Sequence, residues 1–282
     1  MWELLVRSRK FVIGLCVFVA ILIFGIIGPM VTRDPLEKDP VGRRFLPPSW
    51  EYPMGTNIFG EDLFAQLCTG ARNSMIVGGI TGIVGTLIAV ILGSIGPYKG
   101  GIADAISNFV TNVIIVFPTL PLLIVLAAVL QQRSLLLVAL LIGITSWPWA
   151  ARSIRSQVLS LKEREYVDMA RMSGMSDRKV AIAEILPNML AYTLMVFVIM
   201  FGIGVVAEAG ISMLGVGPNP GTNITLGTML YWARMLPHVG AAWWLTWWWF
   251  VPPGVMVAAV TTSIFVMHSG MDEVFNPKLR KV

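Results

Sequence analysis

Side chains that could do chemistry are sparse in this sequence, and two carboxylates stand out because they adjoin long apolar runs. Glu208 lies near the end of the run 189–210, and Asp104 immediately precedes the run 105–130. Ionisable groups inside a membrane commonly form ion or proton pathways. One hypothesis is therefore a stand-alone ion- or proton-coupled transporter with Glu208 and Asp104 as relay groups. The other interpretation places Glu208 in a pore or gate, or has it brace a helix end.

Motifs for catalysis, nucleotide binding and metal binding are absent. None of the seven lysines follows a glycine, so the chain has no Gly-Lys-Ser/Thr phosphate loop. His238 and His268 do not form a His-Glu-x-x-His site, and no Gly-x-Ser-x-Gly elbow occurs. Cys16 and Cys68 are 52 positions apart, which gives no disulfide framework. We expect no enzyme activity, catalytic residue, metal or cofactor in this chain.

The composition indicates a membrane protein. Of the 282 residues, 56% are hydrophobic and 13% charged, and the mean hydropathy is +0.75. A soluble domain carries about 25% charged residues, so lipid must solvate much of this chain. The net charge of +5 fits the Lys and Arg enrichment of cytoplasmic loops, and nucleic acid is not expected as a partner.

Apolar windows of about 20 residues predict an all-α integral membrane protein with about six transmembrane helices. The first apolar stretch is 22 residues long, which is too long for the core of a signal peptide and predicts an uncleaved span. The predicted spans are 11–31, 75–97, 105–130, 135–152, 189–210 and 246–268.

The distribution of Lys and Arg predicts the orientation. With both termini cytoplasmic, the inside segments hold 14 basic residues and the outside segments hold 7. We therefore expect a multi-pass protein of the plasma membrane with both termini inside. The predicted organisation is a cytoplasmic N-terminus (1–10), a six-helix transmembrane domain (11–268) that includes a cytoplasmic loop (about 152–188), and a cytoplasmic tail (269–282).

The loop 152–188, between spans four and five, has the highest charge density, with seven basic and five acidic residues. A helix is expected across Asp168, and Gly174 can end it by adopting a positive φ. Ser176 or Asp177 can then cap a second short helix that runs to about Leu186. Pro187 marks the junction with the next span. The prediction is a helix–turn–helix hairpin, and the alternative is an amphipathic loop that rests on the lipid surface.

This loop resembles the EAA loop of ATP-binding-cassette importer permeases. In that pattern an acidic residue, two small residues, three variable ones and a glycine precede a Leu-Pro about ten residues later. Asp168 replaces the usual glutamate, and Met169 replaces a small residue. The positions that match are Asp168, Met169, Ala170, Gly174, Leu186 and Pro187.

The resemblance extends along the whole chain, and is greatest to the C-type subunit of the oligopeptide, dipeptide and nickel permeases. Glu61 departs from the pattern, because arginine is usual there. The matching segments, in order, are 54–57, 60–62, 70–72, 97–101, 117–118, 208–209, 212–217 and 276–280.

The resemblance implies that the loop is a coupling helix that docks into a separate cytoplasmic ATPase. The residues that it assigns to coupling are Asp168, Met169, Ala170, Gly174, Asp177, Leu186 and Pro187. It also implies a second homologous permease subunit, two ATPase subunits that hold ATP and Mg, and an external substrate-binding protein. The substrates of such importers are di- and oligopeptides, nickel complexes or oligosaccharides.

Overall fold

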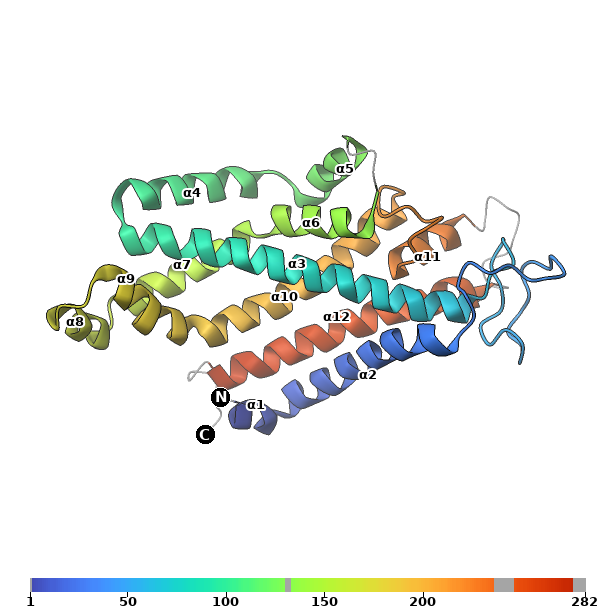
Figure 1. The fold of residues 1–282 in the computed structure, drawn as a ribbon, viewed down its shortest axis with the longest axis horizontal. Helices are drawn as coiled ribbons and strands as arrows, with labels where there is room; N and C mark the ends of the chain where they lie inside the picture. Colours follow the sequence, from blue (N-terminus) through green and yellow to red (C-terminus); the bar gives the residue numbers. More distant parts are fainter. Residues whose placement is uncertain (1, 130–132, 236–245, 276–282) are drawn as a thin grey trace.

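The computed structural model describes residues 2–129, 133–235 and 246–275, which form an elongated helical bundle (Figure 1). Within these residues there is no β-strand, only two isolated bridges in the segment 32–62. The helices, in chain order, are α1 (Trp2–Arg7), α2 (Arg9–Val31), α3 (Leu63–Lys99), α4 (Gly101–Val116), α5 (Thr119–Val129), α6 (Leu135–Ser146), α7 (Pro148–Lys162), α8 (Glu165–Met172), α9 (Asp177–Val180), the π-helix η1 (Ala181–Ile185), α10 (Leu186–Met213), α11 (Leu226–Arg234) and α12 (Trp247–Phe275).

Four helical segments are long and apolar enough to cross a bilayer: α2, α3, η1 with α10, and α12. The pairs α4–α5 and α6–α7 bring the number to six if each is one span, as predicted from sequence. The first pair bends by 85° and the second by 47°. Pro118 and Pro148 lie at these bends, where a residue without an N–H interrupts the helical hydrogen bonds.

The two ends of the bundle differ. The N-terminus, the end of α12 and the segment α8–α9 lie at one end, at the left of Figure 1. The segment 32–62 and α11 lie at the opposite end. Lys10 forms an ion pair with Glu273, which ties the start of α2 to the end of α12. The first and last spans are therefore neighbours.

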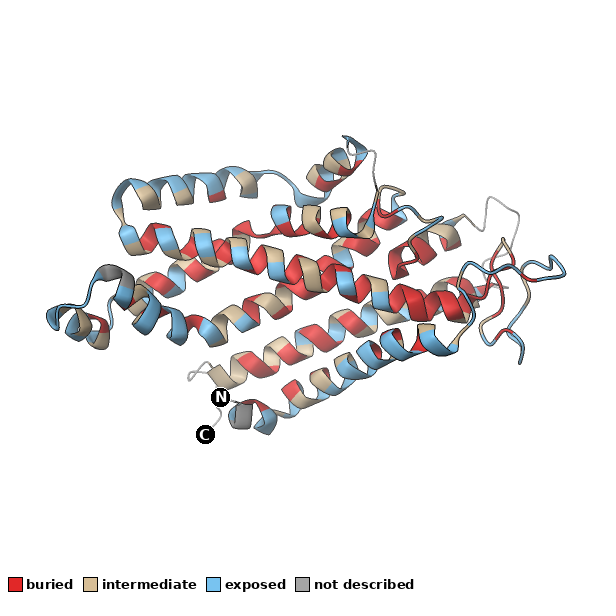
Figure 2. Ribbon diagram, in the orientation of Figure 1, coloured by how far each residue is buried: buried red, intermediate tan, exposed pale blue. Residues whose placement is uncertain are grey.

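Small residues allow the central helices α3 and α10 to pack closely. A Cβ atom added at Gly78 would lie 2.7 Å from the ring of Phe201, and one at Gly82 would lie 2.8 Å from Phe197. Such small positions are typical of helix contacts in membranes, where close approach of the backbones provides the packing energy. Buried residues concentrate along these two helices (Figure 2).

The segment 32–62 is organised around the Asp39 carboxylate. It accepts hydrogen bonds from the Arg43 guanidinium at 2.9 Å, the Tyr52 hydroxyl at 3.1 Å and the Val41 amide at 2.9 Å. The hydrogen bond from Arg43 is the largest influence, and it helps to lower the pKa of Asp39 to about 2. Burial is the main cause of the raised pKa of Tyr52.

Several helices extend beyond the predicted spans. Helix α3 begins at Leu63, ahead of the predicted start at 75, and its added turns contain the buried residues Gln66, Thr69 and Ser74. Residues 152–162, predicted as part of a cytoplasmic loop, form most of α7, and α12 continues to Phe275, beyond the predicted end at 268. Helix α11 was not predicted. The predicted turn at 131–134 and the tail 276–282 lie largely or wholly outside the described residues.

Candidate functional site

Helix α8 forms the first arm of a hairpin that projects from the end of the bundle, as Figure 1 shows. Arg164 is extended (φ −84°, ψ 141°), which separates α8 from α7, and Glu165 and Asp168 place negative charge in the first turn of α8. Val167 is completely buried in a cluster with Val180 and Ile185. That burial fixes which face of α8 turns outward.

Gly174 ends α8 as predicted. Its φ is +81°, and its amide donates to the carbonyl oxygen of Arg171 at 2.9 Å. The amide of Met175 donates to the carbonyl oxygen of Ala170 at 3.2 Å. These two bonds form a Schellman motif, which satisfies carbonyls that the helix end leaves unpaired.

The second arm begins at Asp177, directly after Ser176, and the next span begins at Leu186 beside Pro187, both as predicted. The continuity was not predicted: α9, η1 and α10 run on as one helical path. The amide of Leu186 donates to the carbonyl oxygen of Ala181, which is the wider spacing of a π-turn. Because Pro187 lacks an N–H and its ring crowds the preceding turn, the wider turn lets the helix pass the proline without ending.

The tip of the hairpin exposes one ion pair and three methionines. Asp168 has a side chain 56% exposed and lies 3.5 Å from Arg171, a pair whose solvent exposure limits its contribution to stability. Met169, Met172 and Met175 are 63%, 87% and 41% exposed. Flexible thioether side chains exposed together are suited to an adaptable apolar contact with a partner.

The sequence-predicted site residues fall into two groups. Asp168, Met169 and Gly174 lie at the exposed tip, while Ala170 is half-buried against the cluster beneath α8. Leu186 and Pro187 are exposed on the first turn of α10, beyond the π-turn. Asp177 begins α9, and its side chain lies outside the described residues. The motif residues therefore do not form a single surface patch. They are distributed along the continuous chain from the tip of the hairpin to the start of α10.

The base of the hairpin is attached to neighbouring helices by contacts that the sequence analysis missed. Arg155 of α7 donates to both oxygens of Asp104 on α4, at 2.7 and 3.1 Å. Lys162, the last residue of α7, donates to the carbonyl oxygens of Pro97 and Tyr98 at the end of α3. The sequence did contain an indication of these contacts: basic residues at 152, 155 and 162 are spaced by about one and then two helical turns, which places them on one face of a helix.

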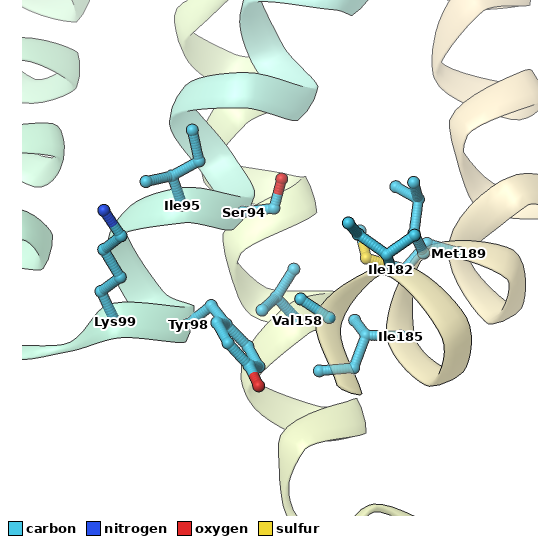
Figure 3. Close-up of a pocket in the computed structure, with 10 residues that line it drawn as sticks. Ser94, Ile95, Tyr98, Lys99, Val158, Ile182, Ile185 and Met189 are labelled. Atoms are coloured by element: carbon cyan, nitrogen blue, oxygen red, sulfur yellow. The ribbon is translucent and has the colours of Figure 1, made fainter. Parts of the chain in front are cut away.

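An apolar cavity of about 290 Å³ lies beneath the hairpin (Figure 3). Tyr98 of α3 and Val158 of α7 line one side, and Ile182, Ile185 and Met189 line the other. The cavity therefore separates the end of α3 from the π-turn.

Glu208 lies far from the hairpin and is completely buried. Its Oε1 accepts hydrogen bonds from Ser212 at 2.7 Å and Thr225 at 2.6 Å, and its Oε2 accepts one from Ser74 at 3.1 Å. Thr225 also caps α11 by accepting from the amide of Thr228. Glu208 thus joins α3 and α10 to the N-terminus of α11, and Asp104 is paired elsewhere. The structure does not bring the two carboxylates of the relay hypothesis together.

The described residues form an all-helical protein with several helices long and apolar enough to cross a membrane. Within the described residues no cluster of metal-ligating side chains occurs. The chain belongs to the family of binding-protein-dependent transport system inner membrane components, whose model matches residues 85–281. Residues 1–48 also match the N-terminal transmembrane domain of oligopeptide transport permease C.

Curated relatives agree with this assignment. The oligopeptide transport system permease protein OppC of Bacillus subtilis is 30% identical over 277 residues, covering 98% of this chain and 88% of the relative. The dipeptide transport system permease protein DppC of the same organism is 29% identical over 216 residues, or 77% and 67% of the two chains. OppC of Mycobacterium tuberculosis is 31% identical over 185 residues, or 65% and 63%.

Proposed function

We propose that this chain is one of two permease subunits of an ATP-driven importer, in which it forms half of the substrate pathway. The partners are a second homologous permease, two cytoplasmic ATPase subunits that hold ATP and Mg, and an external binding protein. The hairpin α8–α9 docks into one ATPase. The chain lies in the plasma membrane with the hairpin and both termini on the cytoplasmic side.

The observation that carries the proposal is an exposed, well-braced hairpin in a chain of the binding-protein-dependent permease family. Val167 is buried at the base and Met172 is 87% exposed at the tip, so the hairpin is both anchored and accessible. Helices η1 and α10 continue directly from its second arm. A push on the tip is therefore transmitted into a span without an intervening flexible linker.

Di- and oligopeptides are the proposed substrates, because the relatives are peptide permeases by name. Oligosaccharides remain the second substrate class that the sequence resemblance implied. The stand-alone transporter is not favoured: Asp104 is held by Arg155 and Glu208 by three hydroxyl groups.

Site-directed crosslinking of the assembled transporter tests the docking. In a chain with Cys16 and Cys68 replaced by alanine, Met172→Cys places a thiol at the tip, and Trp50→Cys places one at the opposite end, where Trp50 is fully exposed. An amine-and-thiol crosslinker should join the Met172→Cys variant to an ATPase subunit and leave the Trp50→Cys variant unjoined to it. Adducts of the hairpin with phospholipid alone would refute the proposal.

A further inference from the structure

Helix α7 is amphipathic, although the bent pair that it forms with α6 is long and apolar enough for one membrane span. Ala151, Ile154 and Val158 are buried against the bundle. The opposite face exposes Arg152, Ser156 and other polar side chains at one-turn spacing. A face turned to lipid should be apolar, so this one is unsuited to hydrocarbon.

Helix α4 continues the same polar face. The Arg152 guanidinium donates to the Asn112 side-chain oxygen at 2.9 Å, and Asn108 is exposed one turn earlier on α4. Most of α4 is exposed, as Figure 2 shows. Asn112 is eleven residues from Gly101, which is ~16 Å along the helix. The contact lies four residues before Val116, the last residue of α4, and so is far from the end of α4 that adjoins α3.

Among the described residues, the guanidinium of Arg152 forms no ion pair. Arg155, one turn away, is paired with Asp104, but among the described residues no carboxylate lies within 4.0 Å of the Arg152 nitrogens. An arginine side chain turned towards hydrocarbon is costly, and such residues in membrane proteins almost always face the interior of the bundle or water. The exposed guanidinium therefore requires water, a counter-ion or both.

We propose that the face formed by Asn108, Asn112, Arg152 and Ser156 borders the aqueous substrate pathway, and that Arg152 binds a carboxylate of the passing substrate. Asn112 accepts one guanidinium N–H, which leaves other donors of the planar fork for a carboxylate. The amide groups of Asn108 and Asn112 add neutral donors. This inference rests on the proposed function, because a peptide carries a C-terminal carboxylate and a neutral oligosaccharide does not.

Thiol labelling tests the pathway and its charge independently of transport. With Cys16 and Cys68 replaced, Ser156→Cys should react with both anionic and cationic methanethiosulfonate reagents in the assembled transporter. Ile23→Cys, on the exposed apolar face of α2, should resist both. Adding Arg152→Gln should lower the ratio of the anionic to the cationic rate at least threefold, because a nearby positive charge is removed. An unreactive Ser156→Cys, or an unchanged ratio, would overturn the inference.

Uptake of trialanine tests the carboxylate site. Arg152→Gln should lower uptake about tenfold, Arg152→Lys should restore it to within threefold, and Lys99→Gln, an exposed cation on α3, should leave it unchanged. Normal uptake in Arg152→Gln would overturn the site. Failure of that variant to assemble with the second permease would also overturn it, by assigning Arg152 to a subunit contact. If the wild type does not take up trialanine, the proposed peptide-import function is contradicted. The thiol-labelling experiment does not depend on that function and tests the pathway separately.

Discussion

The ammonium nitrogen of Lys162 lies 3.1 Å from the carbonyl oxygen of Tyr98 and 5.9 Å from the centre of its ring. Lys162 ends α7 just before the hairpin, and Tyr98 is in the last turn of α3. Positive charge at a helix C-terminus satisfies unpaired carbonyls and complements the helix dipole. The hairpin is therefore anchored at its base to a central span.

Lys162→Gln should loosen this anchor. Losing hydrogen bonds from a charged donor costs about 1–2 kcal/mol, so amides of α8 should exchange hydrogen roughly tenfold faster. Mass-spectrometric hydrogen exchange on the assembled transporter measures this. Lys99→Gln, which changes an exposed lysine at the same corner, is the matched control. Equal exchange in both variants would contradict an anchoring role.

Gly78→Ala should destabilise the contact between α3 and α10. The new Cβ would lie 2.7 Å from the Phe201 ring and 2.8 Å from Val205, and overpacking of this kind costs about 1–3 kcal/mol. Gly254→Ala on α12 is the control, because nothing lies within 4 Å of the added atom. The thermal midpoint in detergent should fall for Gly78→Ala and stay level or rise for Gly254→Ala. A reversed order would show that the packing is misassigned.

Glu208→Ala should lower the thermal midpoint more than Glu208→Gln. Alanine leaves three buried hydroxyl donors without their acceptor, and each unsatisfied group costs about 1–3 kcal/mol. Glutamine keeps one oxygen acceptor, and its amide can donate to a hydroxyl that turns to accept. If the two variants unfold together at the wild-type temperature, Glu208 does not brace α11.

The segment 32–62 should loosen in acid. Because the pKa of Asp39 is lowered from 3.8 to about 2 in the folded protein, its contribution to stability is complete above pH 4 and is lost as the pH falls towards 2. Limited pepsin cleavage within 32–62 should therefore increase between pH 4 and pH 2. Asp39→Asn should be cleaved readily even at pH 4. Cleavage rates are corrected for the pH dependence of pepsin itself. If the corrected rate for the wild type does not change between pH 4 and pH 2, the role of Asp39 is contradicted.

Much of the fold could be predicted because hydropathy reports lipid contact directly. The apolar runs predicted six spans, which correspond to four long helices and two bent helix pairs. The turn at Gly174 followed from the preference of glycine for positive φ. The start of α3 could not be found this way. Its first turns contain Gln66, Asn73 and Ser74, which satisfy their hydrogen bonds through residues distant in the chain, such as Ile224 and Glu208.

The candidate site was predictable in position but not in its connections. The EAA-like spacing located the hairpin residues. Residues 152–162 of α7, however, were assigned to the cytoplasmic loop because they contain many polar side chains. Charged side chains on α7 pair across space with Asp104 and Asn112 on α4, which no local pattern indicates. The π-turn before Pro187 was also missed, because a proline normally marks a helix boundary.

The number of substrate molecules imported per ATP hydrolysed, measured in proteoliposomes with the full transporter, tests the central claim most directly. Gly174→Val strains only the backbone, because its Cβ would meet open space, and Asp168→Arg reverses an exposed charge at the tip. If the hairpin couples transport to ATP hydrolysis, both variants should insert and assemble normally while this ratio falls severalfold. Wild-type ratios in both variants would contradict the coupling role.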